Sequence, residues 1–140
     1  MKYEEMHKDL FTVDESYNLV HCIASDLKMS AGIAVDMQRK FHLRGKIEKS
    51  GESLKHPNCI FAGEVFNLIT KKKSSGKPTL ESLDKAIKKM KSLIQYHEIK
   101  KIAMPKIGCG LDKLSWGEVR ECIHSTFDSI DIEILVCTWE

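Results

Sequence analysis

The sequence predicts an α/β domain with helices on both faces of a β-sheet, because apolar strand-like segments alternate with amphipathic helical segments along the chain. With 140 residues, of which 42% are hydrophobic and 30% are charged, the chain has the length and composition of one globular domain. We therefore expect a single domain over residues 1–140. A domain of this length buries enough apolar surface to fold without a disulfide or a structural metal.

The first half of the chain contains a strand, a helix and a pair of short strands. Residues 18–24 are almost continuously apolar, which is typical of a buried strand. Residues 30–41 place apolar side chains at helical spacing and predict an amphipathic helix. Residues 60–62 and 64–70 follow as two strands that are hinged near Gly63.

The second half alternates helix and strand. A helix is expected after Thr79, which can cap it, because apolar residues then repeat at intervals of three and four. Residues 101–105 indicate a short strand. Ser115 and Glu118 have the S-x-x-E spacing of a capping box and predict the start of another helix. The β-branched residues of segment 132–138 indicate a final strand.

The composition indicates a soluble protein of a reducing compartment. No apolar run approaches the ~18 residues that span a bilayer, and the N-terminus lacks a secretory profile. We therefore expect a cytoplasmic protein without membrane contact, monomeric by default. The five cysteines include no C-x-x-C pair and no zinc-like spacing, and most are expected to be small buried apolar residues. His21 and Cys22 are adjacent, so they would point to opposite faces of a strand, which argues against a shared metal.

The net charge of +2 conceals three blocks of different sign. Residues 1–36 carry 3 basic and 7 acidic side chains (−4), residues 37–106 carry 17 and 6 (+11), and residues 107–140 carry 2 and 7 (−5). A basic middle block of this size attracts phosphate-bearing ligands or nucleic acid. The alternative is a solvated face of lysines that needs no partner.

Three segments follow expected strands, where ligands bind in open α/β sheets: residues 25–34, 70–78 and 106–112. The third contains Gly108 and Gly110 close to an expected helix start. This arrangement suits a backbone that approaches an anion, although a tight structural turn explains the two glycines equally well.

Two side chains at these strand ends suit catalysis. Lys71 directly follows a buried strand, where partial desolvation favours a nucleophilic amine, and the alternative is the first of three solvated lysines. Asp112 adds a carboxylate after the glycine loop. Cys109 lies between the two glycines and is interpreted as loop lining rather than a reactive thiol, since no basic partner is evident.

The following motifs occur in one order along the chain: Asp9-Leu10-Phe11, His21-Cys22-Ile23, Met29-Ser30-Ala31-Gly32-Ile33-Ala34, Leu68-Ile69-Thr70-Lys71-Lys72, Lys77-Pro78-Thr79 and Met104-Pro105-Lys106-Ile107-Gly108-Cys109-Gly110-Leu111-Asp112. Over nearly the whole chain, from about Tyr3 to Trp139, they resemble the macrodomain family, in the branch typified by terminal ADP-ribose protein glycohydrolase. The resemblance implies a three-layer α/β/α macrodomain sandwich with a mixed central sheet, and ADP-ribose bound across the strand ends.

The resemblance also implies how ADP-ribose is held. Asp9 would accept a hydrogen bond from the adenine amino group, and Trp139 would stack on the base unless it is an ordinary terminal tryptophan. Residues 32–34 and 107–111 would bring backbone amides to the pyrophosphate and the distal ribose. The full set of implied ligand contacts is Asp9, Leu10, Ser30, Gly32, Ile33, Ala34, Thr70, Ile107, Gly108, Cys109, Gly110, Leu111 and Trp139. Lys8 and Ser30 stand where the family pattern has glycines.

For catalysis, the resemblance matches Lys71 to a lysine that attacks the anomeric carbon of the distal ribose, and Asp112 to a carboxylate that resolves the adduct and activates water. The implied activity is removal of ADP-ribose from acidic side chains and deacylation of O-acyl-ADP-ribose, with ADP-ribose or ADP-ribosylated protein as partner and no cofactor or metal. Two alternatives remain open. One is a hydrolase of ADP-ribose on DNA, which the basic block favours, and the other is a non-catalytic reader of ADP-ribose.

Overall fold

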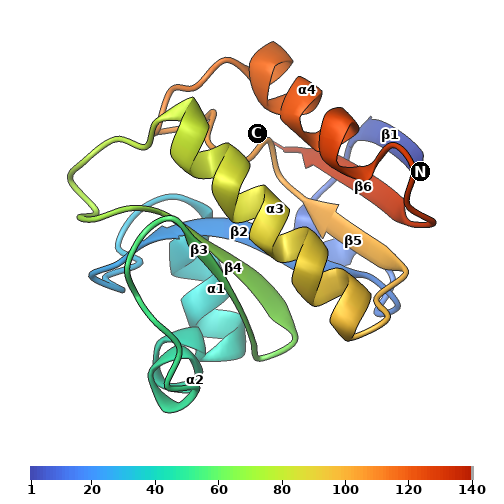
Figure 1. Ribbon diagram of the computed structural model, residues 1–140. Helices are drawn as coiled ribbons and strands as arrows, with labels where there is room; N and C mark the ends of the chain where they lie inside the picture. Colours follow the sequence, from blue (N-terminus) through green and yellow to red (C-terminus); the bar gives the residue numbers. More distant parts are fainter. Residues whose placement is uncertain (140) are drawn as a thin grey trace.

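The computed structural model describes residues 1–139 and shows a six-stranded sheet between two layers of helices (Figure 1). In chain order the elements are β1 (Lys2–His7), the 3-10 helix η1 (Leu10–Thr12), β2 (Asn18–Ala24), α1 (Ile33–Phe41), α2 (Leu43–Lys49), β3 (Asn58–Ala62), β4 (Val65–Lys71), α3 (Leu80–Tyr96), β5 (Lys101–Met104), α4 (Trp116–Phe127) and β6 (Glu133–Thr138). Within residues 1–139, no helix has the length and apolar character needed to cross a lipid bilayer.

The strands lie in the order β1-β6-β5-β2-β4-β3. Neighbouring strands are parallel except β3 and β4, which are antiparallel, so the sheet is mixed. Helices α1 and α2 cover one face, and α3 and α4 cover the other. This arrangement confirms the expected three-layer α/β/α sandwich. Because β2, β4 and β5 are parallel, their carboxyl ends meet at one edge of the sheet.

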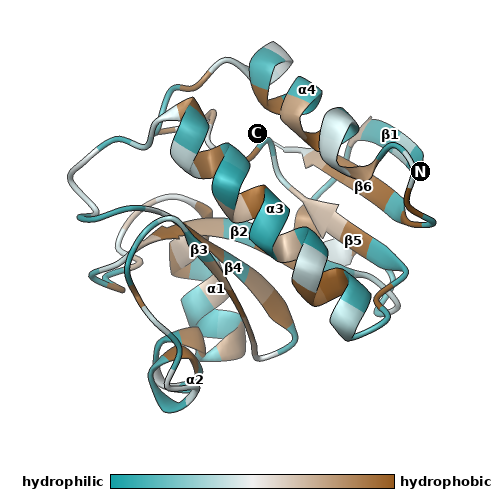
Figure 2. Ribbon diagram, viewed as in Figure 1, coloured by the Kyte–Doolittle hydropathy of each residue, from teal (hydrophilic) through white to brown (hydrophobic). Residues whose placement is uncertain are grey.

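The sheet separates two apolar cores, and Figure 2 shows the brown strands that lie between them. Phe66 and Phe127 are fully buried on the side of α3 and α4, and Met37, Leu43 and Ile47 are fully buried on the side of α1 and α2. Burial of one side chain of this size stabilises the fold by about 1.5–3 kcal/mol. The two cores therefore fix the strands, and with them the loops at the sheet edge.

Strand β1 and helix α2 are not predicted from the sequence. Strand β1 pairs with β6 at the edge of the sheet, and its side chains are half-buried or exposed. Arg120 of α4 holds it by donating two hydrogen bonds to the Glu5 carboxylate, at 2.6 and 3.0 Å, which lowers the pKa of Glu5 to about 2. Helix α2 follows α1 after a break at His42, where φ is 52°.

Helix α1 is shorter than the sequence predicts. It begins at Ile33 rather than at residue 30. Met29 and Gly32 have φ of 47° and 62°, which lie outside the right-handed helical region. Residues 30–32 therefore belong to the loop between β2 and α1, and this loop is free to line a cleft.

The two predicted helix caps have different outcomes. Thr79 caps α3, and its side chain and that of Ser82 exchange hydrogen bonds with each other's backbone N–H. Ser115 has the extended backbone of an N-cap residue, but its side chain makes no capping hydrogen bond, so the predicted capping box with Glu118 is wrong. Both residues are exposed, and water can therefore satisfy the first N–H groups of α4.

The hinge expected near Gly63 is a two-residue hairpin turn between β3 and β4. Gly63 and Glu64 have φ of 61° and 60°, a combination that matches the twist of antiparallel strands. A Cβ on residue 63 would lie 2.8 Å from Cδ2 of Leu43, so the close approach of α2 also requires glycine here.

His21 of β2 and Asn67 of β4 form a polar pair inside the sheet, and both are completely buried. The side-chain amide of Asn67 donates to the carbonyls of Ile60 and Val65, so its oxygen is the acceptor that lies 2.7 Å from Nε2 of His21. His21 therefore carries its proton on Nε2, while Nδ1 has no partner. Burial lowers the pKa of His21 to about 4.

The buried His21 predicts that the fold loses stability in mild acid. Its pKa falls from 6.5 to about 4 on folding, so below pH 6.5 the unfolded chain binds a proton that the folded chain does not. Urea denaturation should show a free energy of unfolding about 2 kcal/mol lower at about pH 5 than at about pH 7. His21→Gln keeps a donor toward Asn67 but does not titrate, and it should remove most of this difference. The same pH dependence in the variant would assign the effect to other groups.

Candidate active site

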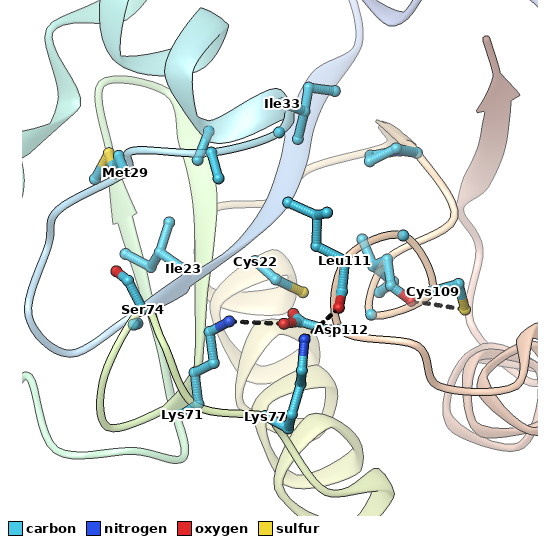
Figure 3. A pocket seen from close by; sticks show the side chains of 18 of the residues that line it. Cys22, Ile23, Met29, Ile33, Lys71, Ser74, Lys77, Cys109, Leu111 and Asp112 are labelled. Atoms are coloured by element: carbon cyan, nitrogen blue, oxygen red, sulfur yellow. Dashed lines mark hydrogen bonds and ion pairs between the residues drawn. The ribbon is translucent and has the colours of Figure 1, made fainter. Parts of the chain in front are cut away.

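A cleft of about 350 Å³ opens at the carboxyl ends of β2, β4 and β5 (Figure 3). Residues 22–24 of β2 and Lys71 at the end of β4 line its inner part. Residues 29–34, from the end of the loop between β2 and α1 into the first turn of α1, form one wall. Residues 105–112, which follow β5, form the other. The cleft thus brings together the three strand-end segments that the sequence singles out.

The first wall is held by side chains from outside the loop. Leu27 and Met29 have φ of 55° and 47°, a region that costs an L-residue about 1–2 kcal/mol. Both side chains are buried, and Arg44 of α2 donates to the carbonyls of Leu27 and Lys28 at 2.7 and 2.6 Å. Helix α2, which the sequence does not predict, therefore positions a wall of the cleft.

The second wall contains two glycines with different roles. Gly108 has φ of 75°, and a Cβ on it would lie 2.9 Å from Leu83 and 3.0 Å from Leu114. Its backbone therefore makes a tight turn against α3. Gly110 has no positive φ, and no atom outside residues 109–111 lies within 4 Å of the position that its Cβ would take. Of these two glycines, only Gly110 is not required by the fold, and the missing side chain leaves open space beside the cleft.

Lys71 and Asp112 meet inside the cleft. Nζ of Lys71 lies 2.6 Å from Oδ1 of Asp112, although 41 positions separate the residues in the chain. The two side chains are only 14% and 15% exposed, and Figure 3 shows them pointing toward each other from opposite segments. Because donor and acceptor are in direct contact, a proton can pass between the amine and the carboxylate without an intervening water.

Lys77 connects the two segments that carry this pair. Its Nζ donates to the carbonyl of Leu111 at 2.6 Å, and Leu111 directly precedes Asp112. Gly76, directly before Lys77, accepts a hydrogen bond from Lys71 at 3.2 Å. These contacts and the two peptide links therefore form a closed ring that includes the amine and the carboxylate.

Asp26 makes a further connection between cleft segments. Its carboxylate accepts hydrogen bonds from the N–H and the hydroxyl of Ser74, at 2.8 and 2.7 Å. Asp26, Arg44 and Lys77 are not predicted from the sequence as functional residues, because each contacts a backbone or side chain that is remote in the chain. The signal that could have found them is a polar side chain that is able to pair with a residue of another strand-end loop.

The structure places most of the predicted ligand contacts on the cleft. Those that line it are Ser30, Gly32, Ile33, Ala34, Ile107, Gly108, Cys109, Gly110 and Leu111. Those that do not are Asp9, Leu10, Thr70 and Trp139. Thr70 lines a separate pocket beside the N-terminus of α3.

The other three lie near the adjoining ends of β1 and β6. Oδ1 of Asp9 accepts a hydrogen bond from the N–H of Phe11 at 3.0 Å and caps η1, and Leu10 is buried. The indole of Trp139 is exposed and stacks on His7, with ring centroids 5.1 Å apart. A ligand that reaches these residues must extend beyond the cleft.

Burial raises the pKa of all five thiols, which are unpaired: Cys22, Cys59, Cys109, Cys122 and Cys137. At Cys22, in the inner part of the cleft, the carboxylate of Asp112 adds to this effect of burial. The Sγ of Cys109 lies 3.4 Å from the carbonyl of Ile107 and donates to it (Figure 3). The raised pKa values keep all five thiols protonated, and only Cys22 and Cys109 among them line the cleft. Across residues 1–139, no set of three His, Cys, Asp or Glu side chains is arranged to hold a metal ion.

The chain is similar to proteins of a known family. Residues 50–123 match the family described as Macro domain. The chain is 42% identical over 136 residues to the ADP-ribose glycohydrolase OARD1 of Bos taurus and 41% identical over 136 residues to the protein of that name from Homo sapiens. Each alignment covers 93% of this chain and 87% of the relative. The macrodomain of Mycobacterium tuberculosis DarG has the same fold, with a TM-score of 0.82 at 21% identity over 96% of each chain.

The contact of Lys77 with Leu111 predicts that Lys77→Met loosens the second wall. Loss of a hydrogen bond from a charged donor, worth about 1.5–3 kcal/mol when buried and less at this exposed site, should speed amide hydrogen exchange in residues 109–113 at least about threefold. Lys106→Met is the control, because Lys106 also lines the cleft and is exposed. Equal exchange rates in the two variants would show that Lys77 does not hold this segment.

Proposed function

Because the chain belongs to the macrodomain family, we propose that it is an ADP-ribosyl hydrolase that removes ADP-ribose from acidic side chains and deacylates O-acyl-ADP-ribose. The relatives at 41–42% identity are named ADP-ribose glycohydrolases, which supports hydrolysis of ADP-ribose linkages. The observation that carries the finer proposal is the 2.6 Å contact between Lys71 and Asp112 inside the cleft.

In this proposal the ligand lies across the strand ends. The pyrophosphate would fit between residues 29–34 and residues 105–112, where backbone N–H groups and Lys106 can neutralise it. Adenine would extend toward the ends of β1 and β6, where Asp9 and Trp139 are located. The distal ribose would then reach Lys71 and Asp112.

In the first step Lys71 is the nucleophile. Asp112 accepts a proton from Nζ, and the uncharged amine attacks the anomeric carbon of the distal ribose. The bond from this carbon to the acyl oxygen breaks, and its electron pair leaves on the carboxylate. A carboxylate is a stable leaving group, so the cleft needs chiefly to position the amine. The products are a ribosyl adduct on Nζ and the free acidic side chain.

In the second step Asp112 activates water. After it has released its first proton to solvent, Asp112 accepts a proton from a water molecule that attacks the anomeric carbon. The bond from this carbon to Nζ breaks, and its electron pair returns to the amine. The proton then passes from Asp112 to Nζ over the same 2.6 Å contact, which restores the starting ion pair.

Lys71→Ala tests the lysine mechanism. Removal of a nucleophile that acts together with its base should lower release of ADP-ribose from a glutamate-linked substrate at least about 10³-fold. Affinity for ADP-ribose in calorimetry should stay close to that of the unmodified chain, because the amine is not needed to hold the ligand. Lys100→Ala, at an exposed lysine just before β5 and outside the cleft lining, should leave both quantities unchanged.

Two results would contradict the proposal. Turnover that survives in Lys71→Ala would exclude the lysine as nucleophile. Binding without turnover in the unmodified chain would show that the protein is a reader of ADP-ribose rather than a hydrolase.

Gly110→Val tests the placement of the ligand. The chain itself has room for a side chain here, so the thermal midpoint should stay near that of the unmodified protein. A ligand that approaches the backbone closely would clash with the isopropyl group, and the Kd for ADP-ribose should rise at least about tenfold. Gly45→Val is the matched control, because residue 45 also has open space around its Cβ position and lies outside the cleft lining. An unchanged Kd in Gly110→Val would place ADP-ribose elsewhere.

A further inference from the structure

A second pocket, of about 310 Å³, adjoins the cleft between the end of β4 and the start of α3. Its lining residues are His56, Thr70, Lys71, Lys72, Lys73, Gly76, Lys77, Thr79 and Ser82. It shares only Lys71 and Lys77 with the cleft proposed for ADP-ribose. The second pocket is therefore a separate space with access to the same lysines.

Thr70 lines the second pocket and has a hydroxyl that makes no hydrogen bond. The residue is 1% exposed, and its Oγ1 has no hydrogen-bond partner. The pairing of β2 with β4 changes register here, from Ile23 with Ile69 to Ala24 with Lys71, and so passes over Thr70. Buried hydroxyls are almost always paired with protein or with a bound molecule, so this donor marks a place for an acceptor.

The charge around the second pocket is positive and incompletely balanced. Asp112 pairs with Lys71, but within residues 1–139 neither Lys72 nor Lys73 takes part in an ion pair. None of the described lining residues has a carboxylate. The local field therefore attracts an anion.

The N-terminus of α3 adds a partial positive charge. Thr79 and Ser82 of its first turn line the second pocket, and the helix runs for 17 residues behind them. The N–H groups of Leu80 and Glu81 have no acceptor within the helix. The Glu81 carboxylate is paired with Lys85 at 3.0 Å and does not line the pocket. The helix end therefore favours an anion in the second pocket, as Thr70 and the lysines do.

We propose that the second pocket binds a phosphate group, independently of the hydrolase activity. Thr70 donates its hydroxyl to one phosphate oxygen, and Lys72 and Lys73 balance the charge. A phosphate group holds its oxygens in a tetrahedral arrangement and carries one negative charge in a nucleic-acid strand and close to two as a free ion. It therefore suits donors that converge from two segments better than a planar carboxylate does. The phosphate comes either from the backbone of a nucleic-acid strand or from a free phosphate ion.

The proposal is tested by binding alone, on the chain saturated with ADP-ribose so that the cleft is occupied. Sodium phosphate is titrated against sodium chloride of equal ionic strength, and the amide NMR signals are followed. Phosphate should shift the signals of residues 70–73 and 79–82, whereas chloride should not.

Thr70→Val should weaken phosphate binding about tenfold or more, which corresponds to about 1.4 kcal/mol, and Thr70→Ser should retain it. Lys89→Met, an exposed lysine of α3 outside the lining, is the matched control for Lys72→Met and Lys73→Met, which should weaken binding.

A second titration, with single-stranded hexathymidine, identifies the source of the phosphate. Tighter binding of the oligonucleotide than of inorganic phosphate, lost in Thr70→Val, supports a nucleic-acid strand, while binding of inorganic phosphate alone supports a free ion.

Equal effects of phosphate and chloride, or equal phosphate affinity in Thr70→Val and the unmodified chain, overturn the proposal. Equal binding of a glutamate-rich peptide overturns the choice of phosphate. These outcomes do not depend on turnover, so they are distinct from any failure of the hydrolase proposal.

Discussion

The contact between Lys71 and Asp112 depends on the parallel arrangement of β2, β4 and β5. Parallel strands bring their carboxyl ends to the same edge, so the residue that ends β4 and the loop that follows β5 face each other across β2. The core residues under α3 fix these strands, and a slip of β4 by one residue would turn Lys71 to the other face. The chemistry of the cleft is therefore a consequence of sheet register before it is a consequence of the two side chains.

The parts of this molecule that the sequence predicts are those with local or periodic signals. The mostly apolar segment of residues 18–24, the repeated spacing of α3 and the turn at Gly63 predict elements that the structure contains. The resemblance that the ordered motifs carry implies the mixed sheet and the two candidate catalytic residues, whose proximity the structure then shows. Strand-end position is informative because the fold class determines where strand ends lie.

The features that the sequence does not predict depend on contacts between remote segments. Arg44 supports Leu27 from another helix, and Lys77 reaches a carbonyl 34 positions away, so neither role has a local pattern. Strand β1 is missed because an exposed edge strand lacks the apolar run of a central one. The prediction for Ser115 fails in the opposite way. The sequence has the spacing of a capping box, but the structure does not form one, because water can reach the helix end.

The edge position of β1 has a consequence for the behaviour of the protein at high concentration. One side of this strand pairs with β6, and the backbone groups of the other side could pair with a strand of another molecule. Lys2 and Glu4 are exposed along it, and an incoming strand would have to strip water from both charges. These side chains thus act as gatekeepers against edge-to-edge aggregation, and they help to keep the sheet finite.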